Sequence, residues 1–156
     1  MWFVETVINV AVFFLSLFLL INTLYLMILI NKNSANTCIL TLSERTTLTN
    51  VKYLFEFIND STKQTKTFLC ADISTNKERF NEFVITENTT ENLLTGTVSL
   101  TIGDWKYNIY QQTSTTNLIV ANSGALVENG KVEVKGTSTD LAEFTSEQTT
   151  YKEFNG

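Results

Sequence analysis

Residues 97–110 read Thr-Val-Ser-Leu-Thr-Ile-Gly-Asp-Trp-Lys-Tyr-Asn-Ile-Tyr, and this stretch decides the fold class. Every second residue of its first half is apolar, and the alternation resumes after Gly103-Asp104. The apolar positions are Val98, Leu100, Ile102, Trp105, Tyr107 and Ile109. Such alternation has the period of a β-strand, whose successive side chains point to opposite faces. We therefore predict two antiparallel strands joined at Gly103-Asp104, with Lys106 and Asn108 facing outward.

Short runs of β-branched and aromatic residues recur along the rest of the chain at roughly ten-residue spacing. They cover residues 37–42, 53–58, 67–70 and 82–86. Asn129-Gly130 stands between two further runs, 125–128 and 131–135, and this dipeptide is typical of a two-residue hairpin turn. The pattern predicts an all-β sandwich of about eight antiparallel strands over residues 37–136.

An apolar run without formal charge extends from Thr6 to Asn31. A bilayer core of roughly 30 Å needs about 20 apolar residues in a helix, and this run is apolar on every side. A cleaved signal peptide competes, but the residues before the run include Glu5 and no Lys or Arg. We expect a continuous helix near Val7 to Ile30, within a transmembrane anchor over residues 1–31 whose residues 6–30 contact the lipid bilayer.

The remaining segments are polar. Residues 32–36 are predicted as a short polar linker, which leaves roughly 20 Å between the membrane and the first strand when Asn31 is included. Residues 137–156 are acidic and are predicted as a C-terminal tail or docking arm. The sequence therefore predicts an anchor, a linker, one domain and a tail.

The composition argues against several classes of function. With 11 basic and 16 acidic residues the net charge is −5, so we expect no direct contact with nucleic acid. The chain has no histidine, which excludes Ser-His-Asp and Cys-His catalysis and histidine-containing zinc sites. No phosphate-binding glycine motif is present. The candidate acids are scattered and mostly at predicted turns: Asp60, Asp72, Asp104 and Asp140. We expect a protein that is not an enzyme, without catalytic, cofactor-binding or metal-binding residues.

Two features allow a functional and a structural interpretation. Cys38 and Cys70 lie in strand-like runs, where they form either a disulfide or a pair of buried thiols, and the second is favoured. Trp105, Tyr107 and Tyr110 could form a carbohydrate-binding platform, although at strand spacing Trp105 and Tyr107 are more often core residues. The glycosylation sequons at Asn59 and Asn88 are expected by chance in a sequence rich in Asn and Thr.

The stretch from Leu54 to Lys135 resembles small structural proteins of phages that infect Bacteroidota-type bacteria. The matching segments occur in the same order and are residues 53–60, 72–83, 105–118 and 127–134. The resemblance covers about half of the chain and implies a virion component, with no catalytic residue to carry over.

The apolar N-terminus departs from such proteins in tailed phages, which have no membrane, and indicates a phage with an internal lipid membrane. We expect a single-pass, membrane-anchored virion protein that tethers a capsid or vertex lattice to that membrane in a homo- or hetero-oligomeric assembly. The host cell membrane is a further location that we consider for the chain during assembly. The alternatives are a bacterial membrane-anchored surface or adhesion module and an accessory subunit of an enzyme.

Overall fold

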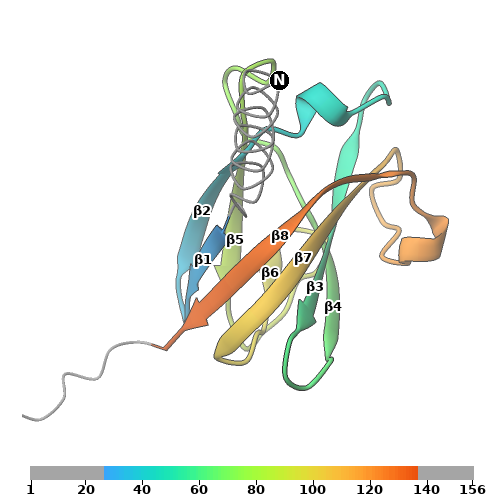
Figure 1. The fold of residues 1–156 in the computed structure, drawn as a ribbon. Helices are drawn as coiled ribbons and strands as arrows, with labels where there is room; N and C mark the ends of the chain where they lie inside the picture. Colours follow the sequence, from blue (N-terminus) through green and yellow to red (C-terminus); the bar gives the residue numbers. More distant parts are fainter. Residues whose placement is uncertain (1–26, 137–156) are drawn as a thin grey trace, which may run out of the picture.

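The computed structural model describes residues 27–136, which form two β-sheets that pack face to face (Figure 1). The larger sheet has the order β1-β8-β7-β3-β4 and the smaller one β2-β5-β6. The strands are β1 (Met27–Asn31), β2 (Ala35–Leu40), β3 (Lys52–Asn59), β4 (Thr65–Cys70), β5 (Asn81–Glu87), β6 (Thr97–Val98), β7 (Gly103–Gln112) and β8 (Leu126–Lys135). Two single 3-10 turns, η1 (Ser43–Arg45) and η2 (Val120–Asn122), interrupt the loops. The predicted all-β, two-sheet architecture is confirmed.

The sequence predicts that all strands pair antiparallel, and this is wrong for two strand pairs. β1 runs parallel to β8, and β5 runs parallel to β6. The order β8-β7-β3-β4, with β7 and β8 antiparallel and consecutive in the chain, is the one that the G, F, C and C′ strands take in immunoglobulin-like sandwiches. Because β1 joins the larger sheet and β2 the smaller, the chain changes sheet at residues 32–34, and β1 and β2 lie along one side of the sandwich (Figure 1).

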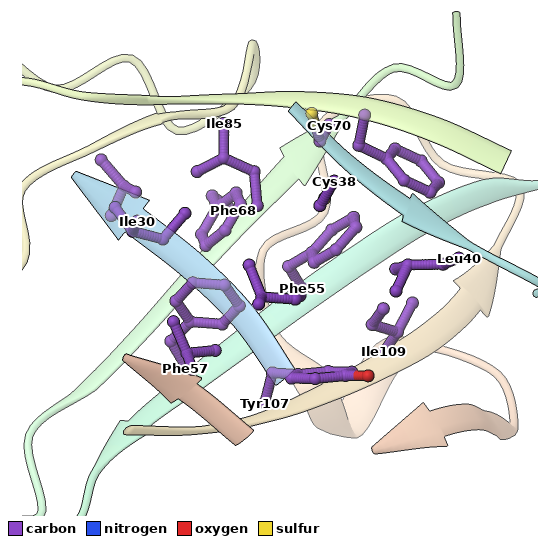
Figure 2. Packing of buried hydrophobic residues seen from close by; sticks show 14 of the residues in the cluster. Ile30, Cys38, Leu40, Phe55, Phe57, Phe68, Cys70, Ile85, Tyr107 and Ile109 are labelled. Atoms are coloured by element: carbon purple, nitrogen blue, oxygen red, sulfur yellow. The ribbon is translucent and has the colours of Figure 1, made fainter. Parts of the chain in front are cut away.

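The inward faces of both sheets are closely packed with aromatic and aliphatic side chains (Figure 2). Trp105, Tyr107 and Ile109 are fully buried, whereas Lys106 is exposed and Asn108 half-buried, so the predicted facing of β7 is confirmed. A group of rings fills the centre and includes Tyr53, Phe55, Phe57, Phe68 and Phe83. Phe55 of one sheet meets Phe83 of the other edge to face, with centroids 5.1 Å apart. Such ring pairs contribute about 0.5–1.5 kcal/mol each beyond simple burial.

The predicted hairpin at Asn129-Gly130 is wrong. β8 continues through both residues, with Asn129 opposite Asn108 and Gly130 opposite Tyr107. A two-residue type I′ turn needs positive φ at both central residues, and neither residue has it. The chain reverses instead in the loop of residues 113–125. A turn at Asn129-Gly130 would have left half of β7 without a partner on that side.

The predicted strand over residues 97–102 is also shorter than expected. Only Thr97–Val98 is strand, and it pairs with β5 rather than with β7. Val98 and Leu100 are buried as predicted, but Ile102 is 65% exposed. Residues 99–102 carry the chain from one sheet to the other, so the alternation breaks there. Gly103 already belongs to β7 and has φ +127°, which glycine tolerates.

The predicted boundary between anchor and domain is wrong as well. Met27–Asn31 is a strand with Ile28 and Ile30 buried, whereas Met27 and Leu29 are exposed. The expected helix therefore does not include Met27–Asn31, and these residues belong to the sandwich that the sequence predicts to start only at residue 37. Residues 32–36, predicted as a linker, form a tight turn and the start of β2, which removes the expected 20 Å spacer.

The other predictions for the two ends, an anchor before Met27 and a tail over residues 137–156, lie outside the described residues. Between Met27 and Gly136 no helix has the length and apolar character needed to cross a membrane.

Candidate functional site

Five polar side chains point into the sandwich near the ends of four strands, β2, β3, β5 and β7, where these strands meet their loops. All are buried: Asn36, Asn59, Asn81, Glu87 and Gln111. A buried polar group is costly unless it is hydrogen-bonded. Each of these side chains accepts hydrogen bonds from backbone N–H groups of a neighbouring segment, so the inner polar sites hold loops in place.

Asn81 and Gln111 show the pattern most clearly. The Asn81 side-chain oxygen accepts from the backbone N–H of Leu42 at 2.8 Å and of Ser43 at 3.1 Å. The Gln111 side-chain oxygen accepts from the N–H of Thr47 at 2.9 Å and of Leu48 at 3.1 Å. Two side chains from different sheets thus hold the 3-10 turn η1 and the loop after it.

Glu87 is the only charged residue among the fully buried ones in the described part of the chain. Its carboxylate accepts from the Lys32 ammonium at 2.6 Å, from the Asn33 N–H at 2.8 Å and from the Leu100 N–H at 3.2 Å. Lys32 also donates to the Leu100 carbonyl at 2.8 Å. This cluster, the Glu87 corner, fastens the turn between β1 and β2 to the end of β5 and to the segment after β6.

The Glu87 corner favours the ionised carboxylate. Burial alone would raise the pKa of Glu87, but the hydrogen bonds from Asn33, Lys32 and Leu100 outweigh it and hold the pKa below its ordinary value of 4.5. A carboxylate held in this way stays charged at neutral pH. It is therefore poorly suited to exchange protons with a substrate.

An open cavity of about 690 Å³ lies at the η1 end of the sandwich. Its wall includes Lys52, Tyr53, Cys70, Asp72 and Asn81. Several polar groups of this wall bond to one another: Tyr53 pairs with Thr46 at 3.0 Å, and Asp72 accepts from the Asn81 amide at 3.0 Å. The side chains of Tyr53, Asp72 and Asn81 are therefore already engaged in hydrogen bonds within the protein.

Asp72 itself holds a turn. It accepts from the backbone N–H of Ser74 at 3.0 Å and of Glu82 at 3.2 Å. Burial raises its pKa, but the hydrogen bonds from Asn81, Ser74 and Glu82 prevail and lower it. Asp72 is therefore an anchor for local backbone, as expected for Asp at a turn.

The other candidate acids do not converge on Asp72. The N–H of Asp60 donates to the Asp104 carbonyl at 3.0 Å, and the Asp60 carboxylate lies 3.2 Å from the Lys106 ammonium. This pair is at the end of β3, whereas Asp72 follows β4 at the opposite end of the same hairpin. Asp140 lies outside the described residues. Between Met27 and Gly136, no group of three or more His, Cys, Asp or Glu side chains is placed to hold a metal ion.

The cysteines and aromatic residues are structural. Cys38 and Cys70 are free, buried thiols, in agreement with the favoured interpretation. The Tyr107 hydroxyl donates to Glu128 at 2.8 Å. Only Tyr110 of the proposed carbohydrate platform is near the surface, where its hydroxyl donates to Glu56 at 3.1 Å. Three aromatic rings are thus not available on one face.

The first of the two glycosylation sequons is also unavailable, because Asn59 is buried. Its side-chain amide donates to the Thr101 hydroxyl at 3.3 Å.

Sequence reasoning missed the inward polar residues altogether. The signal that could have found them is an Asn, Gln or Glu in phase with the apolar residues at the end of an alternating run.

Comparison with known proteins places few constraints on identity. No family model matches the chain, and no curated protein matches it. Among solved structures, the chain is similar to part of a proposed glycoside hydrolase from Bacteroides vulgatus, with a TM-score of 0.40 and 14% sequence identity. The match covers 73% of this chain but only 17% of that protein.

Proposed function

We propose that this chain is a non-enzymatic structural component of a bacteriophage virion. In this proposal an N-terminal apolar segment enters a lipid membrane and the β-sandwich binds neighbouring proteins of a capsid or vertex lattice. The observation that carries the proposal is the use of the buried polar groups. Asn36, Asn59, Asn81, Glu87 and Gln111 all hold loop backbone, which makes a rigid module rather than a reactive pocket.

The corrected boundary supports a close attachment to the membrane. The uncharged run that precedes β1, from Thr6 to Leu26, still has about 20 residues, the length that a bilayer core requires. Since β1 starts at Met27, the anchor would pass into the sandwich without a linker. Met27 and Leu29 are then exposed apolar side chains next to the membrane face, where burial against lipid or a neighbouring protein is favourable.

The proposal is tested by the incorporation of truncated chains into particles. Deleting residues 1–26 should remove the chain from purified particles while leaving the sandwich folded. A matched control replaces residues 6–26 with an unrelated apolar helix of equal length, which should restore incorporation because the anchor acts only as a tether. Detergent extraction should release the full-length chain.

Two outcomes would contradict the proposal. The tether is wrong if the truncated chain is incorporated as well as the full-length chain and lipid extraction never releases the latter. Absence from particles, with the chain exposed on bacterial cells, would favour a membrane-anchored surface module instead.

A further inference from the structure

The outer edge of β2 is an open row of backbone groups. β2 is the terminal strand of its sheet. The Glu87 N–H donates to the Ser34 carbonyl at 2.9 Å, which identifies Ser34 and Glu87 as a hydrogen-bonded pair of the β2–β5 ladder. In an antiparallel ladder the bonding direction alternates, so Asn36, Cys38 and Leu40 face β5. The N–H and C=O groups of Ala35, Thr37 and Ile39 therefore point away from the sheet. Within residues 27–136 no hydrogen bond engages them.

The other sheet edges are shorter or are partly engaged by neighbouring groups. On β4, the Leu69 N–H donates to the Leu93 carbonyl at 2.7 Å, and Lys66 pairs with Glu91 at 2.8 Å. On β1, the outward N–H of Asn31 donates to the Asn36 side chain at 2.8 Å, so only Met27 and Leu29 keep outward backbone groups that no hydrogen bond engages within residues 27–136. β6 has only two residues.

Natural β proteins guard exposed edges with charges, proline or bulges, and β2 has none of these. The nearest cation, Lys32, is turned inward to Glu87. Among the edges of the described sandwich, β2 therefore has the longest row of outward backbone groups without a hydrogen bond, at Ala35, Thr37 and Ile39, and no charged residue interrupts it.

We propose that β2 pairs with β2 of a second copy of this chain, antiparallel and around a two-fold axis at Thr37. In this register Ala35 lies opposite Ile39 of the second copy, and Thr37 lies opposite its own equivalent. The same three residues of each copy therefore form all the outward pairs. The small Ala35 side chain lies beside the large Ile39 side chain, and the two Thr37 side chains lie beside each other at the axis, which is a favourable cross-strand pair. This self-complementarity is what a two-fold interface requires, and it selects a second copy over an unrelated strand.

Charge does not oppose the pairing. Ala35–Leu40 contains no charged residue, and on β5 the acid beside the edge is Glu82, opposite Ile39. The two Glu82 carboxylates would be separated by three strand spacings and offset by four residues, which places them about 20 Å apart. That separation exceeds the Debye length of about 8 Å at physiological ionic strength, so their repulsion is screened. The product is a continuous six-stranded sheet with the order β6-β5-β2-β2-β5-β6.

The test is oxidative cross-linking of the full-length chain in lysates, with copper phenanthroline as oxidant. Thr37→Cys should give a disulfide-linked dimer, because cross-strand partners lie within disulfide range. Thr86→Cys is the matched control: Thr86 faces the same side of the sheet one strand further in, about 20 Å from its equivalent. Thr37→Cys should cross-link about tenfold faster than this control, because pairing raises the effective thiol concentration. The wild-type chain, with both cysteines buried, should not cross-link.

A second measurement fixes the register. Ala35→Cys mixed with Ile39→Cys should cross-link, and neither should cross-link with itself. Thr37→Pro should abolish the dimer without unfolding the sandwich, since the N–H that it removes bonds to nothing within the described domain.

The proposal is overturned if Thr37→Cys reacts with maleimide but cross-links no faster than Thr86→Cys. It is also overturned if its disulfide partner is another protein, which would mean that a foreign strand occupies the edge.

Discussion

The Lys32 ammonium lies 2.6 Å from the carboxylate of Glu87, whose side chain is completely buried while that of Lys32 is 21% exposed. Lys32 follows β1 of the larger sheet, and Glu87 ends β5 of the smaller one. The pair therefore ties the two sheets together at the point where the chain passes from β1 to β2. The backbone N–H of the same Glu87 donates to the Ser34 carbonyl at 2.9 Å, at the start of the β2–β5 pairing.

Glu87→Gln should lower the free energy of unfolding of the full-length chain by about 2–3 kcal/mol, because it removes a buried charge that accepts three hydrogen bonds and leaves Lys32 without a counter-ion. The matched control is Glu133→Gln, whose partner Lys135 is 3.7 Å away at an exposed site. That control should cost less than about 0.5 kcal/mol. Chemical denaturation followed by tryptophan fluorescence measures both. Equal effects would mean that the Glu87 corner contributes no more than a surface pair.

The stability should also depend on pH through Glu87. Because folding lowers its pKa below the ordinary value of 4.5, its contribution is fully present above about pH 4.5 and is lost as the pH falls through the lower pKa of the folded state. Asp72 and Glu91 have lowered pKa values and add a dependence of the same sign. The difference in melting temperature between the wild type and Glu87→Gln should shrink from pH 7 to pH 3. A constant difference over that range would contradict the assignment.

Trp105→Ala should destabilise the chain by about 3–5 kcal/mol, through lost burial and the cavity left behind. The indole is fully buried, and its Nε1–H donates to the Thr101 carbonyl at 2.9 Å. Ile102→Ala is the control three residues earlier, where the side chain is 65% exposed and the change should stay within about 0.5 kcal/mol. Circular dichroism melting curves distinguish the two. An unchanged melting temperature for Trp105→Ala would contradict the assignment of Trp105 to the core and would indicate that its side chain is exposed.

The sequence predicts those strands in which alternation and burial agree. Trp105, Tyr107 and Ile109 alternate with polar residues, and their facing follows directly. The sequence predicts β1 as part of the anchor because Met27-Ile28-Leu29-Ile30 is apolar at every position. A period of two cannot be recognised in such a run, and only the parallel pairing with β8 shows that it is a strand. The sequence predicts about eight strands, and residues 27–136 form eight. The agreement arises because β1 was missed while β8 was divided in two.

The inward polar residues were harder to predict for a different reason. Asn81 and Gln111 look like ordinary surface residues until the loop N–H groups that they accept are in place, and those loops are distant in sequence: Leu42 is 39 residues from Asn81. Local pattern contains no information on such partners. The prediction that Asp72 holds local backbone is confirmed, because its partners Ser74 and Glu82 are only two and ten residues away. Asp104, in contrast, lies in β7.

A continuous β8 and a hairpin turn at Asn129-Gly130 predict opposite effects of a substitution at Asn129 on stability. Asn129→Thr should be neutral or stabilising by up to about 1 kcal/mol, because Asn129 is exposed in an extended strand and Thr has the higher strand propensity. Asn33→Thr is the contrasting change, since Asn33 has φ +55° in the turn between β1 and β2. A β-branched residue there should cost about 1–2 kcal/mol. Destabilisation by Asn129→Thr of that size would support a turn at Asn129-Gly130.

The thiols of Cys38 and Cys70 should not react with thiol reagents in the folded protein. Burial raises the pKa of Cys38 to about 12 and that of Cys70 to about 11, so at pH 8 neither is measurably a thiolate, the form that reacts. Ellman's reagent at pH 8 should therefore modify neither thiol of the native chain. After unfolding in guanidinium chloride without reductant it should modify two thiols per chain. The Thr37→Cys variant adds an exposed thiol next to Cys38 on β2. This thiol should react in the native state, which would show that the reagent reaches β2. Fewer than two thiols after unfolding would mean that Cys38 and Cys70 are oxidised, and rapid reaction before unfolding would mean that the centre of the sandwich opens.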